Sequence, residues 1–189
     1  MSLWDNNIER RDFLRTGLAG LVGMSVPTLL SAGEAYARNG GQWRVSFEQA
    51  HTHDRFSGVY RVGDTYLPEA FEKINRALRD HRTHEIFPMD PHVIDIMSMV
   101  QSKVGRGHKL HVLSGYRSPK TNNMLRGKTR GVAKNSFHMY GQALDLRMDG
   151  VGAARVRGAA RSLKAGGVGY YPRRNFTHVD TGDVRTWTS

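Results

Sequence analysis

Three side chains in the second half of the chain are of the types that can bind a zinc ion together. His138 and Asp145 stand seven positions apart, and His178 follows later in the chain. Imidazole nitrogen and carboxylate oxygen are the ligands that zinc takes where no thiolate is present. The chain has no cysteine, so any metal site must be built from such residues. The spacing of this His-Asp pair is weak support by itself, because most pairs at that distance bind no metal.

The elements predicted around the first pair could bring it together. Residues 143–148 alternate in polarity, which is typical of a strand, and Asp145 lies on the more polar face. Gly141 lets the preceding chain turn back. His138, at the end of a loop, could then approach Asp145 from outside the strand.

A second strand is predicted over residues 176–180. Side chains two positions apart in a strand point to the same face, so His178 and Asp180 would share one side of the sheet. Asp180 could act there as a general base. Alternatively, it could bind the His178 imidazole and fix its tautomer. Both roles place Asp180 next to the metal.

The segment from Ser136 to Asp145 fits the pattern S-x-H-x-x-G-x-A-x-D at every fixed position. This pattern resembles the zinc D-alanyl-D-alanine metallopeptidase family, which has the Hedgehog/DD-peptidase fold. Further segments resemble its periplasmic murein endopeptidase K branch, namely SGYR at 114–117, GGVGYYP at 166–172 and HVDTG at 178–182. The resemblance covers nearly all of the chain after residue 37.

The resemblance implies that His138, Asp145 and His178 bind one zinc ion, with water in the fourth position. Three protein ligands and one open position are the arrangement of catalytic zinc. Zinc held in this way lowers the pKa of its water toward 7 and polarises a carbonyl group. The implied reaction is hydrolysis of the peptide cross-links of peptidoglycan, with its stem peptides as substrate.

Other site residues are expected from the same motifs. The resemblance implies that Arg117 stabilises the developing oxyanion, a contribution of about 3–4 kcal/mol for one such donor, and that Ser136 contacts the substrate. A surface arginine after a turn is the alternative for Arg117. Four tyrosines could line the cleft or pack in the core, with Tyr116 the one expected to contact substrate: Tyr116, Tyr140, Tyr170 and Tyr171.

The sequence departs from the family pattern at Asn175. Relatives often have glutamate three residues before the last histidine, where it acts as general base, and an amide cannot take a proton. Asp180 is therefore the predicted base, with a spare histidine as the alternative. The pair His51 and His53 could approach a metal from one strand face, or both could be ordinary polar surface residues.

Two alternative functions stay open. Because of Asn175, the chain could hold zinc and bind peptidoglycan without turnover. It could also be a D,D-carboxypeptidase or dipeptidase of the same family, since the sequence does not show whether the groove is open or closed. The formal net charge of +11 favours anionic partners such as acidic wall polymers, nucleic acid or a membrane surface. The basic residues are scattered and no nucleic-acid motif is present, so we expect no nucleic-acid partner.

The first 37 residues have the three regions of an export signal in order. Arg10 and Arg11 precede Phe-Leu, an uncharged apolar run covers 16–30, and Ala-Tyr-Ala at 35–37 fits a cleavage site. That run is shorter than the roughly 20 residues that span a bilayer as a helix. We expect the twin-arginine export machinery to deliver residues 38–189 to the periplasm as one monomeric zinc peptidase domain without a stable membrane anchor. An N-terminal amphipathic or core helix is the alternative.

The remaining patterns predict an α+β domain. A total of 189 residues, 39% hydrophobic and 24% charged, suits one folded domain. Gly63-Asp64 favours a hairpin turn, residues 127–135 a loop, and Gly166-Gly167 the end of the last helix. Helices precede most of the strands, which favours an antiparallel sheet flanked by helices. Helices are expected near 68–81, from 91, near 120–126 and over 152–165, and strands over 109–113, 143–148, 168–171, 176–180 and 184–187.

Overall fold

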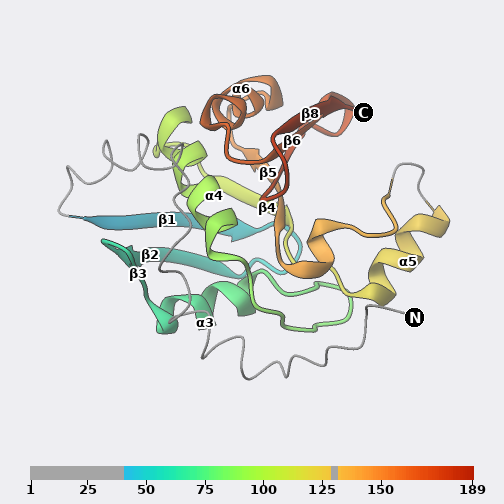
Figure 1. Cartoon of the computed structure of the whole chain (residues 1–189), viewed down its shortest axis with the longest axis horizontal. Coiled ribbons are helices and arrows are strands. Elements are labelled where there is room, and N and C mark those ends of the chain that lie inside the picture. Colours follow the sequence, from blue (N-terminus) through green and yellow to red (C-terminus); the bar gives the residue numbers. More distant parts are fainter. Residues whose placement is uncertain (1–40, 129–131) are drawn as a thin grey trace.

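One mixed sheet of eight strands is the framework of the part of the chain that the computed structural model describes, residues 41–128 and 132–189 (Figure 1). The order across the sheet is β3-β2-β1-β4-β5-β7-β6-β8. The predicted export signal lies outside the described residues. The strands are β1 Gln42–Gln49, β2 Arg55–Val62, β3 Thr65–Tyr66, β4 Leu110–Ser114, β5 Ala143–Met148, β6 Gly167–Tyr171, β7 Phe176–Asp180 and β8 Arg185–Thr188.

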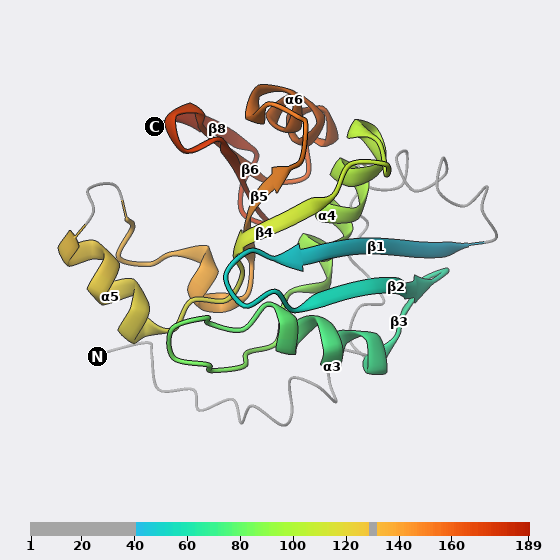
Figure 2. The same ribbon diagram turned by 180° about the vertical axis from the view of Figure 1, so that it is seen from behind.

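The sheet is mostly antiparallel, as predicted, but two pairs of neighbouring strands are parallel. β1 and β4 run in the same direction, and so do β6 and β8 (Figure 2). Parallel strands need a long crossover connection, and the chain between β1 and β4 supplies one. β8 reaches the outer edge of β6 after the chain has reversed at the end of β7. The expected antiparallel sheet is thus corrected to a mixed one, while the expected combination of sheet and helices is confirmed.

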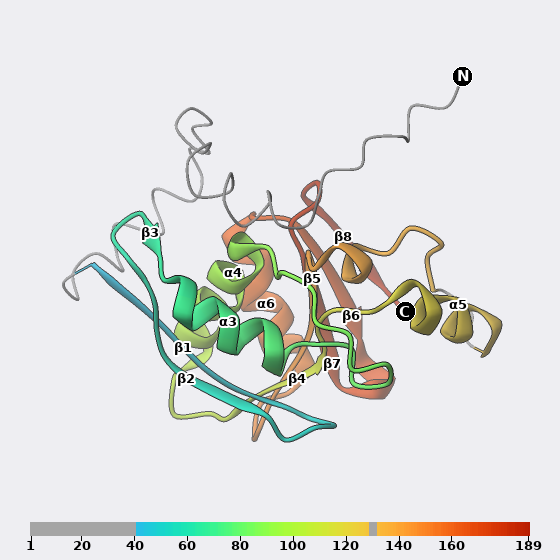
Figure 3. The ribbon, with the colours of Figure 1, turned by 90° about the horizontal axis from the view of Figure 1, so that it is seen from below.

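Four α-helices and two short 3-10 helices complete the described residues. A proline begins α3, α4 and α5, where its missing N–H costs no hydrogen bond. α3, α4 and α6 lie on one side of the curved sheet, and α5 lies on the other side (Figure 3). No helix among the described residues has the length and apolar character that crossing a membrane requires. The bounds are α3 Pro68–Ala77, α4 Pro91–Val104, α5 Pro119–Lys128, α6 Ala153–Leu163, η1 Phe137–Tyr140 and η2 Pro172–Arg174.

The apolar core lies between these helices and the sheet, with α4 buried over most of its length. One carboxylate is embedded in it. Asp95 of α4 is only 2% exposed. It accepts hydrogen bonds from the hydroxyls of Tyr60 and Tyr66 at 2.7 and 2.6 Å, and from the guanidinium of Arg61 at 2.9 Å. This network ties β2 and β3 to α4.

Alternation along β5 and β7 separates the core from the functional residues. Leu144, Leu146 and Val179 are buried in the core. Asp145 and His178 stand opposite each other in register and point to the other face of the sheet, which we call the site face. The strands predicted over residues 143–148 and 176–180 are confirmed with those bounds.

The predicted end of the last helix is wrong. α6 ends at Leu163, Lys164 takes the left-handed conformation, and Gly167 already begins β6. A Cβ on Gly166 would lie 1.9 Å from the carbonyl oxygen of Asp180. Glycine stands there because two backbone segments approach closely, and not because a helix ends. The hairpin at Gly63-Asp64 is confirmed between β2 and β3. The loop predicted over residues 127–135 begins later than expected, because α5 extends to Lys128. Residues 129–131 lie outside the described residues.

Candidate metal centre

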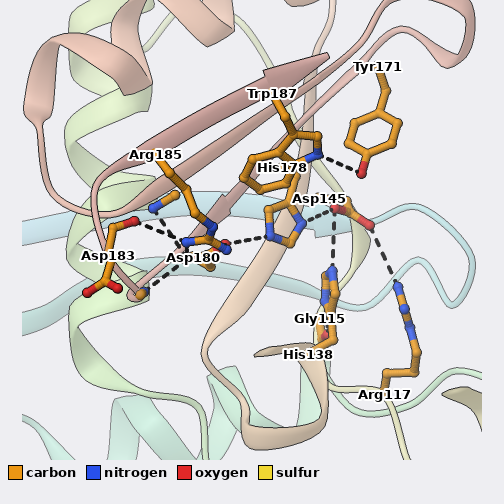
Figure 4. Close-up of polar contacts among 12 residues, drawn as sticks. Gly115, Arg117, His138, Asp145, Tyr171, His178, Asp180, Asp183, Arg185 and Trp187 are labelled. Atoms are coloured by element: carbon orange, nitrogen blue, oxygen red, sulfur yellow. Dashed lines mark hydrogen bonds and ion pairs between the residues drawn. The ribbon is translucent and has the colours of Figure 1, made fainter. Parts of the chain in front are cut away.

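The structure brings His138, Asp145 and His178 together on the site face (Figure 4). One ligand atom from each lies within 4.8 Å of the other two. Asp145 Oδ1 is 3.4 Å from His138 Nε2 and 2.9 Å from His178 Nδ1. The strand register places Asp145 against His178, and η1 brings in His138. All three side chains are at most slightly exposed.

His138 is held in one tautomer by the loop that follows β4. Its Nδ1 is 2.8 Å from the carbonyl oxygen of Gly115. A carbonyl oxygen can only accept, so Nδ1 carries the proton and Nε2 keeps a free lone pair toward Asp145. The backbone N–H of Arg117 also donates to the carbonyl oxygen of His138 at 3.0 Å. The predicted SGYR motif thus fixes the histidine before any metal binds.

His178 is oriented by a carboxylate behind it. Its Nε2 donates to Asp180 Oδ2 at 3.0 Å, which makes Nδ1 the nitrogen on the side of Asp145. Asp180 is completely buried. It accepts from both terminal nitrogens of Arg185, at 2.9 and 2.7 Å, and from the backbone N–H of Gly182 at 2.9 Å. A carboxylate that fixes the tautomer of a ligating histidine is a recurrent feature of metal sites.

The general-base role expected for Asp180 does not fit this arrangement. A base must reach the reacting water, whereas Asp180 lies on the Nε2 side of His178 and the other two candidate ligands lie on the Nδ1 side. Its carboxylate is also engaged by Arg185 and by backbone donors. The other role weighed from the sequence, fixing the tautomer of His178, agrees with the geometry.

The charges in the cluster suit a cation. Burial opposes ionisation of Asp145, but His138 and His178 outweigh burial and hold the pKa of Asp145 far below its usual value. Burial lowers the pKa of His138, which stays neutral. Burial acts in the same direction on His178, but hydrogen bonds to Asp145 and Asp180 raise its pKa to about 9. An ionised carboxylate and a neutral imidazole are ready to bind a metal, while His178 must first lose a proton.

Arg117 and Ser136 both line a cleft of about 560 Å³ beside the cluster. The Nη2 atom of Arg117 is 4.0 Å from Asp145 Oδ2. Ser114 and Asn122 accept weak hydrogen bonds from the same guanidinium, both at 3.4 Å. Arg117 is therefore held beside the candidate ligands and is not a surface arginine.

The family of peptidoglycan L,D-endopeptidase MepK matches residues 38–187. This chain belongs to that family. It is 43% identical over 144 residues to the probable peptidoglycan L,D-endopeptidase MepK of Haemophilus influenzae, over 76% of this chain and 77% of the relative. It is 41% identical over 143 residues to the peptidoglycan L,D-endopeptidase MepK of Escherichia coli K12, over 76% and 79% of the two chains. The resemblance found in the motifs is confirmed.

A more distant similarity agrees with the donor set. The chain is 28% identical over 144 residues to the zinc D-Ala-D-Ala carboxypeptidase of Streptomyces albus G, over 71% of this chain and 54% of that protein. Two imidazole nitrogens and one carboxylate oxygen, with no thiolate, form a ligand set typical of catalytic zinc. The residues of this chain therefore fit the metal for which that relative is named.

Three aromatic or histidine predictions do not fit the structure. Tyr116 is only 7% exposed and its ring stacks on Phe87 at 4.8 Å, so its expected contact with substrate is corrected to a packing role. Tyr140 is largely exposed and does not line the cleft. His51 and His53 lie in the turn after β1 and do not share a strand face. The ring of His51 stacks on that of His81, and His53 lies within ion-pair distance of the Glu48 carboxylate.

Asn175 faces away from the candidate metal site. It ends η2 in the left-handed conformation, which asparagine adopts more readily than most residues. Its side-chain oxygen accepts a hydrogen bond from the backbone N–H of Ala153, the first residue of α6, at 3.1 Å. At this position the chain therefore uses the side chain to hold α6 and supplies no base to the site.

Sequence reasoning missed two side chains that contact Asp180 and His178, namely Arg185 and Trp187. Both come from β8, which pairs with β6 so that Gly167 and Gly169 stand beside them. A Cβ on Gly167 would lie 2.3 Å from the Arg185 guanidinium, and one on Gly169 would lie 2.5 Å from the Trp187 ring. The glycines let both side chains lie across β6. Glycine at alternate positions of a strand was the available signal, since it marks close approach of another group.

Proposed function

We propose that this chain is a zinc-dependent L,D-endopeptidase that hydrolyses peptide cross-links of peptidoglycan. The observation that carries the proposal is the cluster of His138, Asp145 and His178, preorganised beside Arg117 at a cleft. Family membership and the printed names of the relatives support the L,D bond as the target. The cleft also carries Arg173 and Arg174 on its rim, and this positive charge would attract the carboxylates of stem peptides.

Each side chain at the cleft has a proposed role in this reaction. His138, Asp145 and His178 would hold a single zinc ion, which would supply Lewis acidity and activate a water. Arg117 would donate to the carbonyl oxygen of the scissile bond as negative charge develops there. Asp180 would keep the His178 Nδ1 lone pair aimed at the metal position. Ser136 would contact the substrate from the edge of the cleft.

The test is mass spectrometry of defined cross-linked muropeptides after incubation with the purified protein. Substrates with a diaminopimelate–diaminopimelate cross-link and with a D-Ala–diaminopimelate cross-link are compared, with and without a chelator. We expect cleavage of the first cross-link, loss of activity with the chelator and recovery with added zinc. A His138→Ala variant serves as the inactive control.

Other results would favour the alternatives. Binding to peptidoglycan without chelator-sensitive products would indicate a non-catalytic binding protein. Release of only the C-terminal residue of a stem peptide would indicate a carboxypeptidase. Either result would overturn the endopeptidase proposal.

We further propose that residues 1–37 direct the chain through the twin-arginine machinery, and that residues 38–189 act in the periplasm as a monomer. The ordered signal regions support this, and so does the location of peptidoglycan outside the cytoplasmic membrane. Cell fractionation of a variant with Arg10→Lys and Arg11→Lys tests it. We expect the variant to stay in the cytoplasm, and normal export would contradict the proposed route.

A further inference from the structure

The wall of the cleft across from Arg117 carries a tyrosine hydroxyl that no step described above uses. Tyr171 ends β6 and lines the same cleft as Arg117 and the three candidate ligands. In Figure 4 its hydroxyl points toward Asp145, and Arg117 approaches Asp145 from the other side. A substrate in this cleft would therefore lie between a fixed cation and a neutral hydroxyl.

The hydrogen bonding of Tyr171 leaves its proton available to a ligand. The indole Nε1 of Trp187 lies 3.1 Å from the Tyr171 hydroxyl oxygen. An indole N–H can only donate, so the Tyr171 oxygen must accept in this contact and keeps its own proton to donate. Within the described parts of the chain, no acceptor for that proton lies at hydrogen-bond distance. The donor is therefore directed to whatever occupies the cleft.

Packing holds this donor in place. The Tyr171 ring stacks on the ring of Phe176, with centroids 4.3 Å apart and an interplanar angle of 10°. Trp187 is positioned in turn by Gly169, since any side chain there would collide with the indole, and it packs against His178 at 5.3 Å between ring centroids. A hydroxyl fixed at both ends of its ring needs no reorganisation during reaction, which is the property of an effective transition-state donor.

We propose that Tyr171 is a catalytic hydrogen-bond donor to the substrate carbonyl oxygen that gains negative charge, acting together with Arg117, and that Trp187 is its positioning residue. The inference rests on the proposed endopeptidase function and deepens it. Tyr171 stays protonated throughout and no bond to it forms or breaks. A neutral donor and a cation on opposite walls would stabilise the charge and also fix the orientation of the scissile bond.

The first test compares the steady-state kinetics of zinc-loaded variants. Tyr171→Phe keeps the ring that stacks on Phe176 and removes only the hydroxyl, so kcat should fall by about 10²-fold while KM changes little. Trp187→Phe removes the orienting N–H and should lower kcat by about three- to tenfold, the range of one neutral hydrogen bond. Tyr170→Phe is the matched control, because Tyr170 lies outside the cleft beside Arg157, and it should leave kcat unchanged.

The second test separates a catalytic role from a structural one. Binding of a phosphinate peptide analogue, whose tetrahedral group has charged oxygens, is measured beside binding of the product peptide. Tyr171→Phe should weaken binding of the analogue by about the factor by which it lowers kcat, and should weaken binding of the product much less. Equal weakening of both, or wild-type kcat in Tyr171→Phe, would overturn the inference while leaving the endopeptidase function intact. If the wild-type protein shows no chelator-sensitive cleavage, both the inference and the endopeptidase function are overturned. Unchanged zinc content and melting temperature of the variants exclude misfolding.

Discussion

Replacing Asp180 by asparagine separates its role as a partner of His178 from a role in proton transfer. The substitution keeps the shape of the side chain and removes its charge. The asparagine oxygen would stay with Arg185 and the Gly182 N–H, which places the amide NH₂ against His178 Nε2. Because an NH₂ group can only donate, Nε2 would become the acceptor, and the single proton of the neutral, metal-binding form of the imidazole would move to Nδ1. That proton would stand on the atom that faces Asp145.

The size of the effect follows from these contacts. Loss of the partner of a ligating histidine typically lowers metal affinity by about 10–100-fold, which corresponds to about 1.4–2.7 kcal/mol. Breaking a fully buried ion pair costs about 3–5 kcal/mol. The Arg185 side chain is 40% exposed and can be rehydrated, so we expect a smaller loss of about 1–2 kcal/mol in the free energy of unfolding.

The assay is zinc affinity by competition with a chromogenic chelator, followed by kcat at saturating zinc. Asp180→Asn should bind zinc about 10–100-fold more weakly and recover most of the wild-type kcat once the site is filled. Asp183→Asn is the control, since it removes the same charge from an exposed side chain in the adjacent turn. If Asp180→Asn binds zinc as tightly as the wild type and yet loses turnover by more than about 10³-fold, Asp180 acts on the reacting water and the orienting role is refuted.

Two further predictions concern metal uptake and the core. His178, with its pKa raised to about 9 against a usual value of 6.5, carries a proton at neutral pH that zinc must displace. Zinc affinity should therefore rise about tenfold per pH unit up to about pH 9, with release of about one proton. Calorimetry in buffers of different ionisation enthalpy measures both quantities. An affinity that does not change between pH 6 and 8 would contradict the prediction. In the core, Asp95→Ala leaves one buried and two partly buried donors without their acceptor and should lower the free energy of unfolding by about 3–5 kcal/mol in urea denaturation. Asp64→Ala, at an exposed position, should change it by less than about 1 kcal/mol, and equal effects of the two substitutions would show that the buried network contributes nothing.

Local patterns predicted the elements that carry the site. The period-two alternation around Asp145 and His178 was sufficient to predict β5 and β7 with their observed bounds, because each strand has one face in the core. The same reasoning failed at Gly166-Gly167. Two adjacent glycines favour a helix end as readily as close packing between strands, and only the contact with Asp180 decides between these readings.

Long-range pairing was beyond the reach of the sequence. Nothing in residues 185–188 indicates that β8 lies parallel to β6, so Arg185 and Trp187 could not be placed beside Asp180 and His178. The side chain of Asn175 likewise turns to the N-terminus of α6, which follows from the packing of that helix on β6 and β7.

The sequence by itself determined the chemical type of the centre. The absence of cysteine and the complete motif from Ser136 to Asp145 restrict the ligands to imidazole and carboxylate and indicate the family, because residue types and short spacings are encoded locally. The tertiary structure decided the geometry on which the proposed roles rest. Which histidine nitrogen is free, whether Asp180 orients or reacts, and whether Tyr116 or Tyr171 meets the substrate all depend on contacts between residues far apart in the chain. Those contacts are set by strand pairing, which no local pattern specifies.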